Sequence, residues 1–264
     1  MSRPWAAGAD HEAVRRFIEF KDNRRPNPER LLTLEGLFET ALPGKAGRPL
    51  TEWFACPELL KTPETQRVFQ EWCDGGTPGY TVSPRVFQKM IDRDEGDGLV
   101  ALAPLPLLPT LPDTAPKRTL ILDGLEIPGN AGTILRSAEG AGFDLVIHLR
   151  RRHRLTHPKM AHASLGACFY LTQFDAEDPA SLYAWLSDRG VQIHLADSKE
   201  ASEVRAETQQ NAVPPLALVL GGEKQGIHTD WYALPHTSLK IPMRGRIDSL
   251  NVACAATVLL YELS

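Results

Sequence analysis

Residues 240–263 read K-I-P-M-R-G-R-I-D-S-L-N-V-A-C-A-A-T-V-L-L-Y-E-L, and this stretch decides the fold. A short apolar run ends at Pro242, a polar loop containing Gly245 follows, and a run rich in Ala, Val and Leu completes the stretch. This order predicts a strand, a loop and a helix, with Ser249 as the candidate N-cap of that helix. Two earlier stretches are expected to converge on it.

The composition is that of an ordinary globular protein: 264 residues, 42% hydrophobic and 23% charged, with room for one large domain or two ordinary ones. No apolar run is long enough to span a membrane, and the first ten residues lack the order of a signal peptide. The four cysteines form no C-x-x-C pair, which is typical of reduced thiols. We therefore expect a cytoplasmic protein without a membrane partner. Because the net charge is −4, any binding of nucleic acid must rely on local basic clusters.

The first hundred residues alternate between strand-like and helix-like patterns, which predicts a small α/β domain over residues 1–103. A strand is expected to run into a helix near Gly36, and Ser83 is the candidate N-cap of a later helix. Further helices are predicted over 11–20, 64–73 and 84–91, and strands over 51–56, 80–82 and 98–102. Residues 104–116 contain five prolines and predict a semi-rigid linker.

Residues 117–264 predict a second α/β domain with a mostly parallel sheet that helices cover on both faces. In this domain G-G-E at 221–223 directly follows a buried strand, at the edge where open α/β sheets bind ligands. By itself this is weak evidence, because many strand-ending turns look like it. Strands are expected over 118–122, 144–149, 167–172, 191–196, 215–220 and 237–241, and helices from Asn130 to Gly142 and over 158–165 and 180–189.

Two basic clusters, in the loop 21–30 and in the segment 148–162, are candidates for contact with RNA phosphates. The alternative for both is a solvated loop. Three histidines in the second cluster have no nearby cysteine and no standard zinc spacing, so no metal is expected. The candidate RNA-binding residues are Lys21, Arg24, Arg25, Arg150, Arg151, Arg152, Arg154 and Lys159.

Three segments together carry a family resemblance. They are N-A-G-T-I-L-R-S-A at 130–138, L-V-L-G-G-E-K-Q-G-I at 218–227 and I-P-M-R-G-R-I-D-S-L-N-V-A at 241–253. In order and spacing they resemble the three motifs of the SpoU/TrmH family, the RNA 2′-O-ribose methyltransferases of the SPOUT superfamily. The resemblance covers residues 117–264, and the first hundred residues more loosely resemble the family's L30e-like substrate-binding domain.

The resemblance implies a trefoil-knotted sheet, a homodimer whose active site is completed across the interface, and S-adenosylmethionine (AdoMet) as the methyl donor. The residues that it assigns to the donor pocket are Leu195, Gly221, Ile241, Met243 and Leu250. It also implies that the protein methylates a ribose 2′-hydroxyl. The absence of a basic C-terminal extension and the extra N-terminal domain favour ribosomal RNA, with tRNA as the second option.

Arg136 matches the family's characteristic arginine, which is proposed to assist deprotonation of the ribose hydroxyl. A guanidinium does not ordinarily act as a base, so we favour a role in organising phosphate and hydroxyl, with the base role left open. The matching polar residues are Asn130, Glu223, Ser249 and Asn251. Each of the five also has a structural alternative: helix caps for Asn130 and Ser249, a turn carboxylate for Glu223, a buried amide for Asn251 and a surface ion pair for Arg136.

Ala253 and Cys254 depart from the family pattern, which commonly has a small hydroxyl residue there. Two other functions compete with ribose methylation. One is a non-catalytic RNA-binding protein of SPOUT ancestry that acts in ribosome assembly, which would not bind AdoMet. The other is base-directed methylation, which the arginine in the first motif disfavours. The sequence does not distinguish a housekeeping methylation from one that confers antibiotic resistance.

Overall fold

The computed structural model describes residues 4–92, 95–197, 202–203 and 215–264. The chain forms two compact units. The first consists of Met1–Leu105 and Leu155–Phe169, and the second of Pro106–Arg154 and Tyr170–Ser264. The segment 155–169 thus groups with the first unit, although the sequence places it in the C-terminal domain. The domain boundaries themselves stay a prediction.

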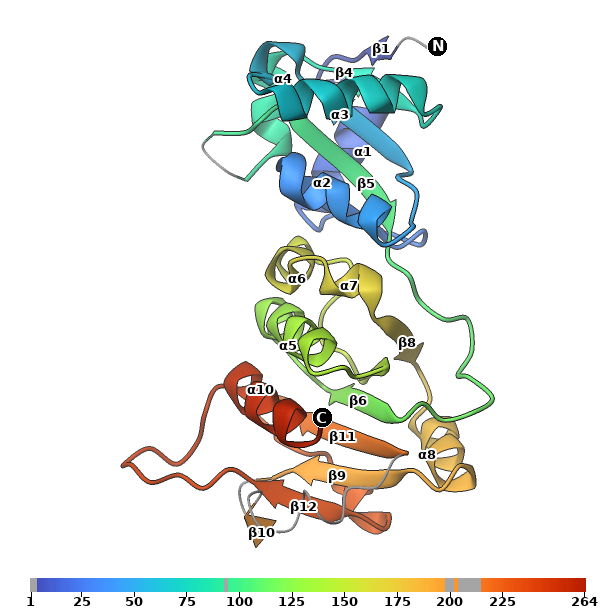
Figure 1. The fold of residues 1–264 in the computed structure, drawn as a ribbon, viewed down its shortest axis with the longest axis vertical. Coiled ribbons are helices and arrows are strands. Elements are labelled where there is room, and N and C mark those ends of the chain that lie inside the picture. Colours follow the sequence, from blue (N-terminus) through green and yellow to red (C-terminus); the bar gives the residue numbers. More distant parts are fainter. Residues whose placement is uncertain (1–3, 93–94, 198–201, 204–214) are drawn as a thin grey trace. The chain divides into compact units, whose positions relative to one another are not determined.

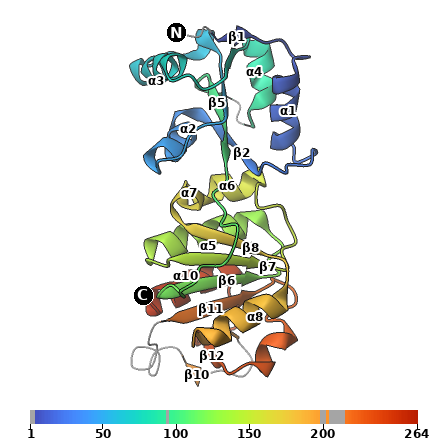
Figure 2. The same cartoon turned by 90° about the vertical axis from the view of Figure 1, so that its right-hand side faces the viewer.

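The first unit is built on a five-stranded mixed sheet of order β1-β4-β3-β5-β2 (Figures 1 and 2). Its strands are β1 (Trp5–Ala6), β2 (Leu31–Glu35), β3 (Glu52–Ala55), β4 (Gly79–Thr81) and β5 (Leu99–Pro104). Its helices are α1 (Glu12–Lys21), α2 (Gly36–Lys45), η1 (Pro57–Leu59), α3 (Pro63–Asp74), α4 (Pro84–Met90), α6 (Pro158–Ser164) and most of α7 (Ala167–Tyr170). All the elements predicted for residues 11–102 are present, with ends shifted by a few residues.

The core of this unit follows from helical spacing on α1. Val14 and Phe17 are fully buried. The rings of Phe17 and Phe54 pack edge to face, with their centroids 5.4 Å apart. On the same strand as Phe54, Trp53 packs over Gly79, where an added Cβ would lie 2.0 Å from the indole ring. A glycine is therefore required opposite Trp53.

The strand predicted over 167–172 is wrong, because residues 167–170 form the short helix α7 and the strand β8 spans Thr172–Ala176. Leu165 (φ 46°) and Gly166 (φ 93°) both lie in the left-handed region, which ends α6 and lets a new helical turn start at once. The apolar run alone did not distinguish these alternatives, because short buried helices and strands share it.

The second unit is a seven-stranded sheet of order β10-β12-β9-β11-β6-β7-β8, in which all adjacent pairs are parallel. The strands besides β8 are β6 (Arg118–Asp123), β7 (Leu145–Leu149), β9 (Gln192–Ala196), β10 (Ser202–Glu203), β11 (Leu216–Gly221) and β12 (Thr237–Lys240). The helices are α5 (Pro128–Gly140), α8 (Pro179–Asp188), η2 (Thr229–Ala233) and α10 (Val252–Glu262). The predicted mixed α/β class with a mostly parallel sheet is confirmed.

Helices cover both faces of this sheet (Figure 2). On one face, Trp185 and Leu182 of α8 pack with Trp231 of η2 against alternate residues of the central strands. On the other face α5 and α10 lie side by side, and the hydroxyls of Ser137 and Thr257 join them at 2.7 Å. The three motifs lie at or after the ends of β6, β11 and β12 in the chain, and the first and the third run into α5 and α10 on this second face.

Two predicted helix caps are corrected. Helix α10 begins one residue after Asn251, whose side-chain oxygen accepts a hydrogen bond from Ala253 N at 2.8 Å, so Asn251 and not Ser249 is the N-cap. Helix α5 begins before Asn130, with Ile127 at the N-cap position, so Asn130 lies in the first turn with its side chain free for other partners. Ser83 occupies the N-cap of α4 but makes no capping hydrogen bond through its side chain.

No helix among the described residues is long and apolar enough to cross a membrane. The cytoplasmic location, the trefoil knot and the L30e-like assignment of the first unit stay predictions.

Candidate functional site

A cavity of about 410 Å³ opens at the carboxyl ends of β9, β11 and β12 in the second unit. Its volume lies in the range that small-molecule sites occupy. The wall is mostly apolar, with three carboxylates and two asparagines among its polar groups. The lining residues are Ile127, Asn130, Ala196, Asp197, Leu220, Gly221, Gly222, Glu223, Gly226, Leu239, Ile241, Met243, Asp248, Ser249, Leu250, Asn251, Val252, Ala255 and Leu259.

The three motif segments meet in one chain of hydrogen bonds at this cavity. The amide of Asn130 donates to Glu223 Oε1 at 2.9 Å, and Asn251 Nδ2 donates to Asn130 Oδ1 at 3.3 Å. Asn251 also caps α10, so its side chain is held at both ends. The predicted residues Asn130, Glu223 and Asn251 are thereby brought together from positions about 30 to 120 residues apart.

Glu223 anchors the loop that follows β6. Its carboxylate accepts the backbone N–H groups of Glu126 at 2.8 Å and Ile127 at 3.2 Å. Partial burial by itself raises the pKa of Glu223, but the hydrogen bonds from Glu126 N and the Asn130 amide outweigh it, and the pKa lies below its ordinary value. Glu223 is thus an ionised hydrogen-bond acceptor at neutral pH.

The glycines at the end of β11 allow close packing within the protein itself. A Cβ on Gly221 would lie 2.1 Å from the backbone of Gly226, and one on Gly222 would lie 2.6 Å from the carbonyl oxygen of Gly124. Gly226 has φ +70°, the left-handed region that favours glycine. The backbone of the second motif therefore folds onto itself and onto the loop that follows β6 at the cavity wall.

Most of the predicted donor-pocket residues line the cavity: Gly221, Ile241, Met243 and Leu250. Leu195 does not, because it is fully buried on the α8 face of β9. Successive residues of a strand point to opposite faces, so β9 contributes Ala196 to the lining, with Asp197 just beyond the strand. Alternation along 191–196 was the signal that could have separated Leu195 from Ala196.

Ser249 and Arg136 differ in their relation to the cavity. Ser249 is a lining residue, and its hydroxyl lies 3.5 Å from Asp248 Oδ1. Arg136 is exposed on α5 and is not a lining residue, and the described part of the chain offers its side chain no hydrogen bond or ion pair. Within one chain, Arg136 is therefore outside the cavity that the other four predicted catalytic residues line.

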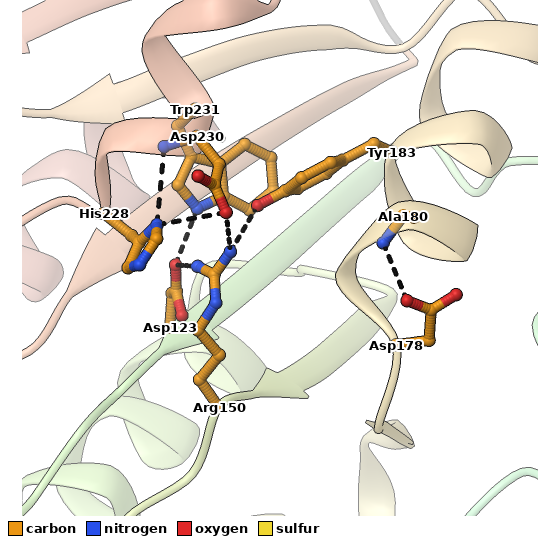
Figure 3. A network of polar contacts seen from close by, with 8 residues as sticks. All are labelled: Asp123, Arg150, Asp178, Ala180, Tyr183, His228, Asp230 and Trp231. Atoms are coloured by element: carbon orange, nitrogen blue, oxygen red, sulfur yellow. Dashed lines mark hydrogen bonds and ion pairs between the residues drawn. The ribbon is translucent and has the colours of Figure 1, made fainter.

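The basic side chains predicted to bind RNA differ in their surroundings. Among the described residues, ion pairs join Lys21 to Asp22 and Asp92, Arg24 to Asp22, Arg25 to Glu19, Arg150 to Asp123 and Asp230, and Arg151 to Asp175. Arg152 and Lys159 are exposed, and Arg154 is half-buried. Arg150 is the clearest departure from the prediction, since its guanidinium is directed into the protein (Figure 3).

Sequence reasoning missed Asp197 and Tyr232. Asp197 lines the cavity and accepts a hydrogen bond from the hydroxyl of Tyr232 at 2.6 Å. No motif contains either residue, and their contact spans 35 residues. Among the described residues, no group of three or more His, Cys, Asp or Glu side chains is arranged to hold a metal ion.

The profile of the SpoU rRNA Methylase family matches residues 117–261. A Staphylococcus saprophyticus protein named "Putative TrmH family tRNA/rRNA methyltransferase" is 35% identical over 150 residues, which cover 54% of this chain and 57% of that protein. A Staphylococcus aureus protein of the same name gives the same identity and coverage. The match thus spans little more than half the length of these relatives.

Solved structures extend the likeness over the whole chain. A crystal structure of an RNA 2′-O ribose methyltransferase has a TM-score of 0.77 and 27% identity, covering 98% of this chain and 97% of its own. An AdoMet-bound rRNA methyltransferase from Sinorhizobium meliloti has a TM-score of 0.81 at 20% identity, covering 99% of this chain and 97% of its own, which shows a shared fold. Because the family profile matches more than half of the chain, the protein belongs to the SpoU rRNA Methylase family.

Proposed function

We propose that this protein transfers a methyl group from AdoMet to a ribose 2′-hydroxyl of RNA, with ribosomal RNA favoured over tRNA. The observation that carries the proposal is the hydrogen-bonded chain Glu223–Asn130–Asn251 at the mouth of a cavity of about 410 Å³. It unites the three motifs of the family to which the chain belongs.

The cavity suits AdoMet in size and in charge. The donor combines adenine and the methylene groups of methionine with a positive sulfonium and a zwitterionic amino-acid end. The lining combines apolar side chains with the carboxylates of Asp197, Glu223 and Asp248. We propose that Gly221, Ile241, Met243 and Leu250 hold the donor, with Ala196 in place of Leu195. In the transfer the ribose oxygen forms a bond to the methyl carbon as the carbon–sulfur bond breaks, S-adenosylhomocysteine leaves and the hydroxyl proton is released to solvent. Since the methyl group of AdoMet is already electrophilic, what the protein must add is mainly alignment of the acceptor oxygen.

Alignment is the role that we propose for the polar residues. Asn130 and Asn251 are fixed by Glu223 and by the α10 cap, so their amides need no reorganisation during the reaction. Arg136 is proposed to hold the RNA phosphate and the hydroxyl. A guanidinium carries five donors and stays protonated, which suits an organiser better than a base.

We further propose that the protein acts as a homodimer whose site is completed by a second copy. Exposed apolar side chains lie on α10 and on the loop before it: Ile247 is 65% exposed, Tyr261 56% and Val258 41%. Such a group is typical of an interface. A second copy placed there would account for the position of Arg136 outside the cavity of its own chain.

The test uses RNA from cells that lack the gene, incubated with the protein and AdoMet labelled on its methyl group. A 2′-O-methyl group blocks alkaline cleavage of the adjacent phosphodiester, so label in alkali-resistant dinucleotides identifies ribose methylation. Label released in mononucleotides would instead indicate methylation of a base. Separate ribosomal and transfer RNA fractions decide the substrate class, and absence of AdoMet binding by calorimetry would favour the non-catalytic RNA-binding alternative.

A further inference from the structure

A second polar cluster, drawn in Figure 3, lies at the same edge of the sheet as the donor cavity. None of its side chains lines that cavity. We call it the Asp123 cluster; it consists of Asp123, Arg150, Tyr183, Asp230 and Trp231. Asp123 Oδ2 accepts hydrogen bonds from Arg150 Nη1 at 2.6 Å and from Trp231 Nε1 at 2.7 Å. Arg150 Nη2 donates to the Tyr183 hydroxyl at 2.6 Å and to Asp230 Oδ2 at 2.7 Å.

The centre of the cluster is buried and charged. Asp123 is 3% exposed and Trp231 is fully buried, with the Tyr183 ring edge-on to the indole at 4.8 Å. Burial raises the pKa of Asp123, and the hydrogen bond from Trp231 and the charge of Arg150 act in the opposite direction. A buried carboxylate that loses its cationic partner is strongly unfavourable, so Arg150 is essential to this arrangement.

The backbone of Arg150 is also unusual. Its φ is 46°, in the left-handed region that costs energy for a residue with a side chain. The turn after β7 thereby directs the guanidinium inwards, towards Asp123 and Asp230 (Figure 3).

The cluster connects two segments that flank Glu223 in the fold: the end of β6 and the helix η2. Asp123 is the last residue of β6 and directly precedes the segment 124–127, in which the N–H groups of Glu126 and Ile127 donate to the Glu223 carboxylate. Trp231 and Asp230 belong to η2, and His228 alone separates this helix from the second motif at 218–227. Between them, Gly222 is packed against the carbonyl of Gly124.

We infer that Arg150 is a positioning residue for the methyl-donor site: it neutralises buried Asp123 and grips Asp230, which keeps the loop 221–228 seated against residues 124–127. The inference rests on the proposed function for the identity of the donor. Arg150 does not line the donor cavity, and it acts through the backbone that presents Gly221, Gly222 and Glu223.

The test compares AdoMet binding by calorimetry in the wild type, Arg150→Gln and the double variant Asp123→Asn/Arg150→Gln. We expect Arg150→Gln to weaken AdoMet binding about tenfold, in the range for side chains that act through a packed network. The double variant should recover to within about threefold of wild type, because two amides replace the ion pair without leaving a buried charge. A residue that merely fills space would not be rescued by a second substitution.

The matched control is Arg189→Gln. Arg189 also lies in the second unit, donates to the carbonyl oxygen of Asp113 at 2.9 Å and stacks over the Trp185 ring at 5.1 Å. It belongs to no part of the Asp123 cluster, so its substitution should leave AdoMet affinity unchanged. Tyr183→Phe is a milder variant that keeps the ring against Trp231 and removes one hydrogen bond, with an expected loss of about threefold.

Hydrogen exchange of the peptides that cover 121–131 and 218–231, measured without AdoMet, separates this inference from the proposed function. We expect faster exchange in Arg150→Gln and wild-type exchange in the double variant. If the exchange rates follow this pattern but the wild-type protein does not bind AdoMet, the positioning role of Arg150 is supported and the proposed donor is refuted. The inference would be overturned if Arg150→Gln kept wild-type exchange and AdoMet affinity, or if the double variant bound AdoMet no more tightly than the single one.

If circular dichroism shows that Arg150→Gln does not fold, the same comparison is made with Tyr183→Phe. Unchanged AdoMet affinity and unchanged exchange in that variant would overturn the inference.

Discussion

The side-chain amide of Asn130 donates a 2.9 Å hydrogen bond to the carboxylate of Glu223, 93 residues later in the chain. This contact joins the first and second motifs, and Asn251 adds the third through Asn130 Oδ1. Because Glu223 also receives two backbone N–H groups, removing its carboxylate leaves several donors without their partner at once.

Glu223→Ala should therefore reduce methyl transfer about 10- to 100-fold, the loss expected when partly buried donors go unsatisfied. The measurement is the initial rate with labelled AdoMet and saturating RNA. The matched control is Glu177→Ala, at an exposed carboxylate outside the cavity lining. Equal rates for the two variants would remove Glu223 from the site.

Gly221→Ala should destabilise the second unit and weaken AdoMet binding, because its Cβ would lie 2.1 Å from the Gly226 backbone, which has no flexible side chain to move aside. We expect the melting temperature to fall by several degrees, as for a clash of about 1–3 kcal/mol. Gly129→Ala is the control, since nothing lies within 4 Å of an added Cβ there. A Gly221→Ala protein as stable as the Gly129→Ala protein would contradict the close packing.

Arg136→Ala should abolish turnover while AdoMet binding stays close to that of the wild type, because Arg136 does not line the cavity. If a second copy completes the site, mixing the inactive variants Arg136→Ala and Asn251→Ala after unfolding and refolding should restore about a quarter of the wild-type rate. Half of the dimers would be mixed, and one site in each would contain both native residues. No recovery, with mixed dimers verified by mass, would place both residues in the same subunit's site.

His148 should make stability depend on pH below neutrality. It is 2% exposed on β7, its Nε2 lies 2.9 Å from Gln173 Oε1, and burial lowers its pKa to about 4. His148 takes up a proton near pH 6.5 in the unfolded chain, but only near pH 4 in the folded protein. The free energy of unfolding therefore has its full value above pH 6.5 and decreases as the pH falls from 6.5 towards 4. The loss amounts to about 3 kcal/mol, with a slope of about 1.4 kcal/mol per pH unit.

Urea unfolding at pH 7.0, 6.0 and 5.0 measures this slope. His148→Gln should reduce the slope by the contribution of one proton, about 1.4 kcal/mol per pH unit. His236→Gln, at an exposed position, is the matched control. An identical slope in the His148→Gln protein and the wild type would show that His148 does not cause the pH dependence.

The sequence by itself determined the order of elements, the α/β class and the segments that form the cavity. Helical spacing, strand patterns and glycine-containing loops are local properties, so most predicted elements are present and only the run at 167–172 was assigned to the wrong class. The motif pattern likewise singled out Asn130, Glu223 and Asn251, which the fold brings into one hydrogen-bonded chain.

Only the tertiary structure decided which partner each charged or apolar side chain has. Arg150 belongs to a basic run that is typical of an RNA-binding loop, yet its guanidinium binds Asp123, 27 residues away, and Asp230, 80 residues away. Local sequence carries no information about such distant partners. In the same way, the choice between Leu195 and Ala196 at the cavity depends on which face of β9 meets α8, and this is settled by packing across the sheet.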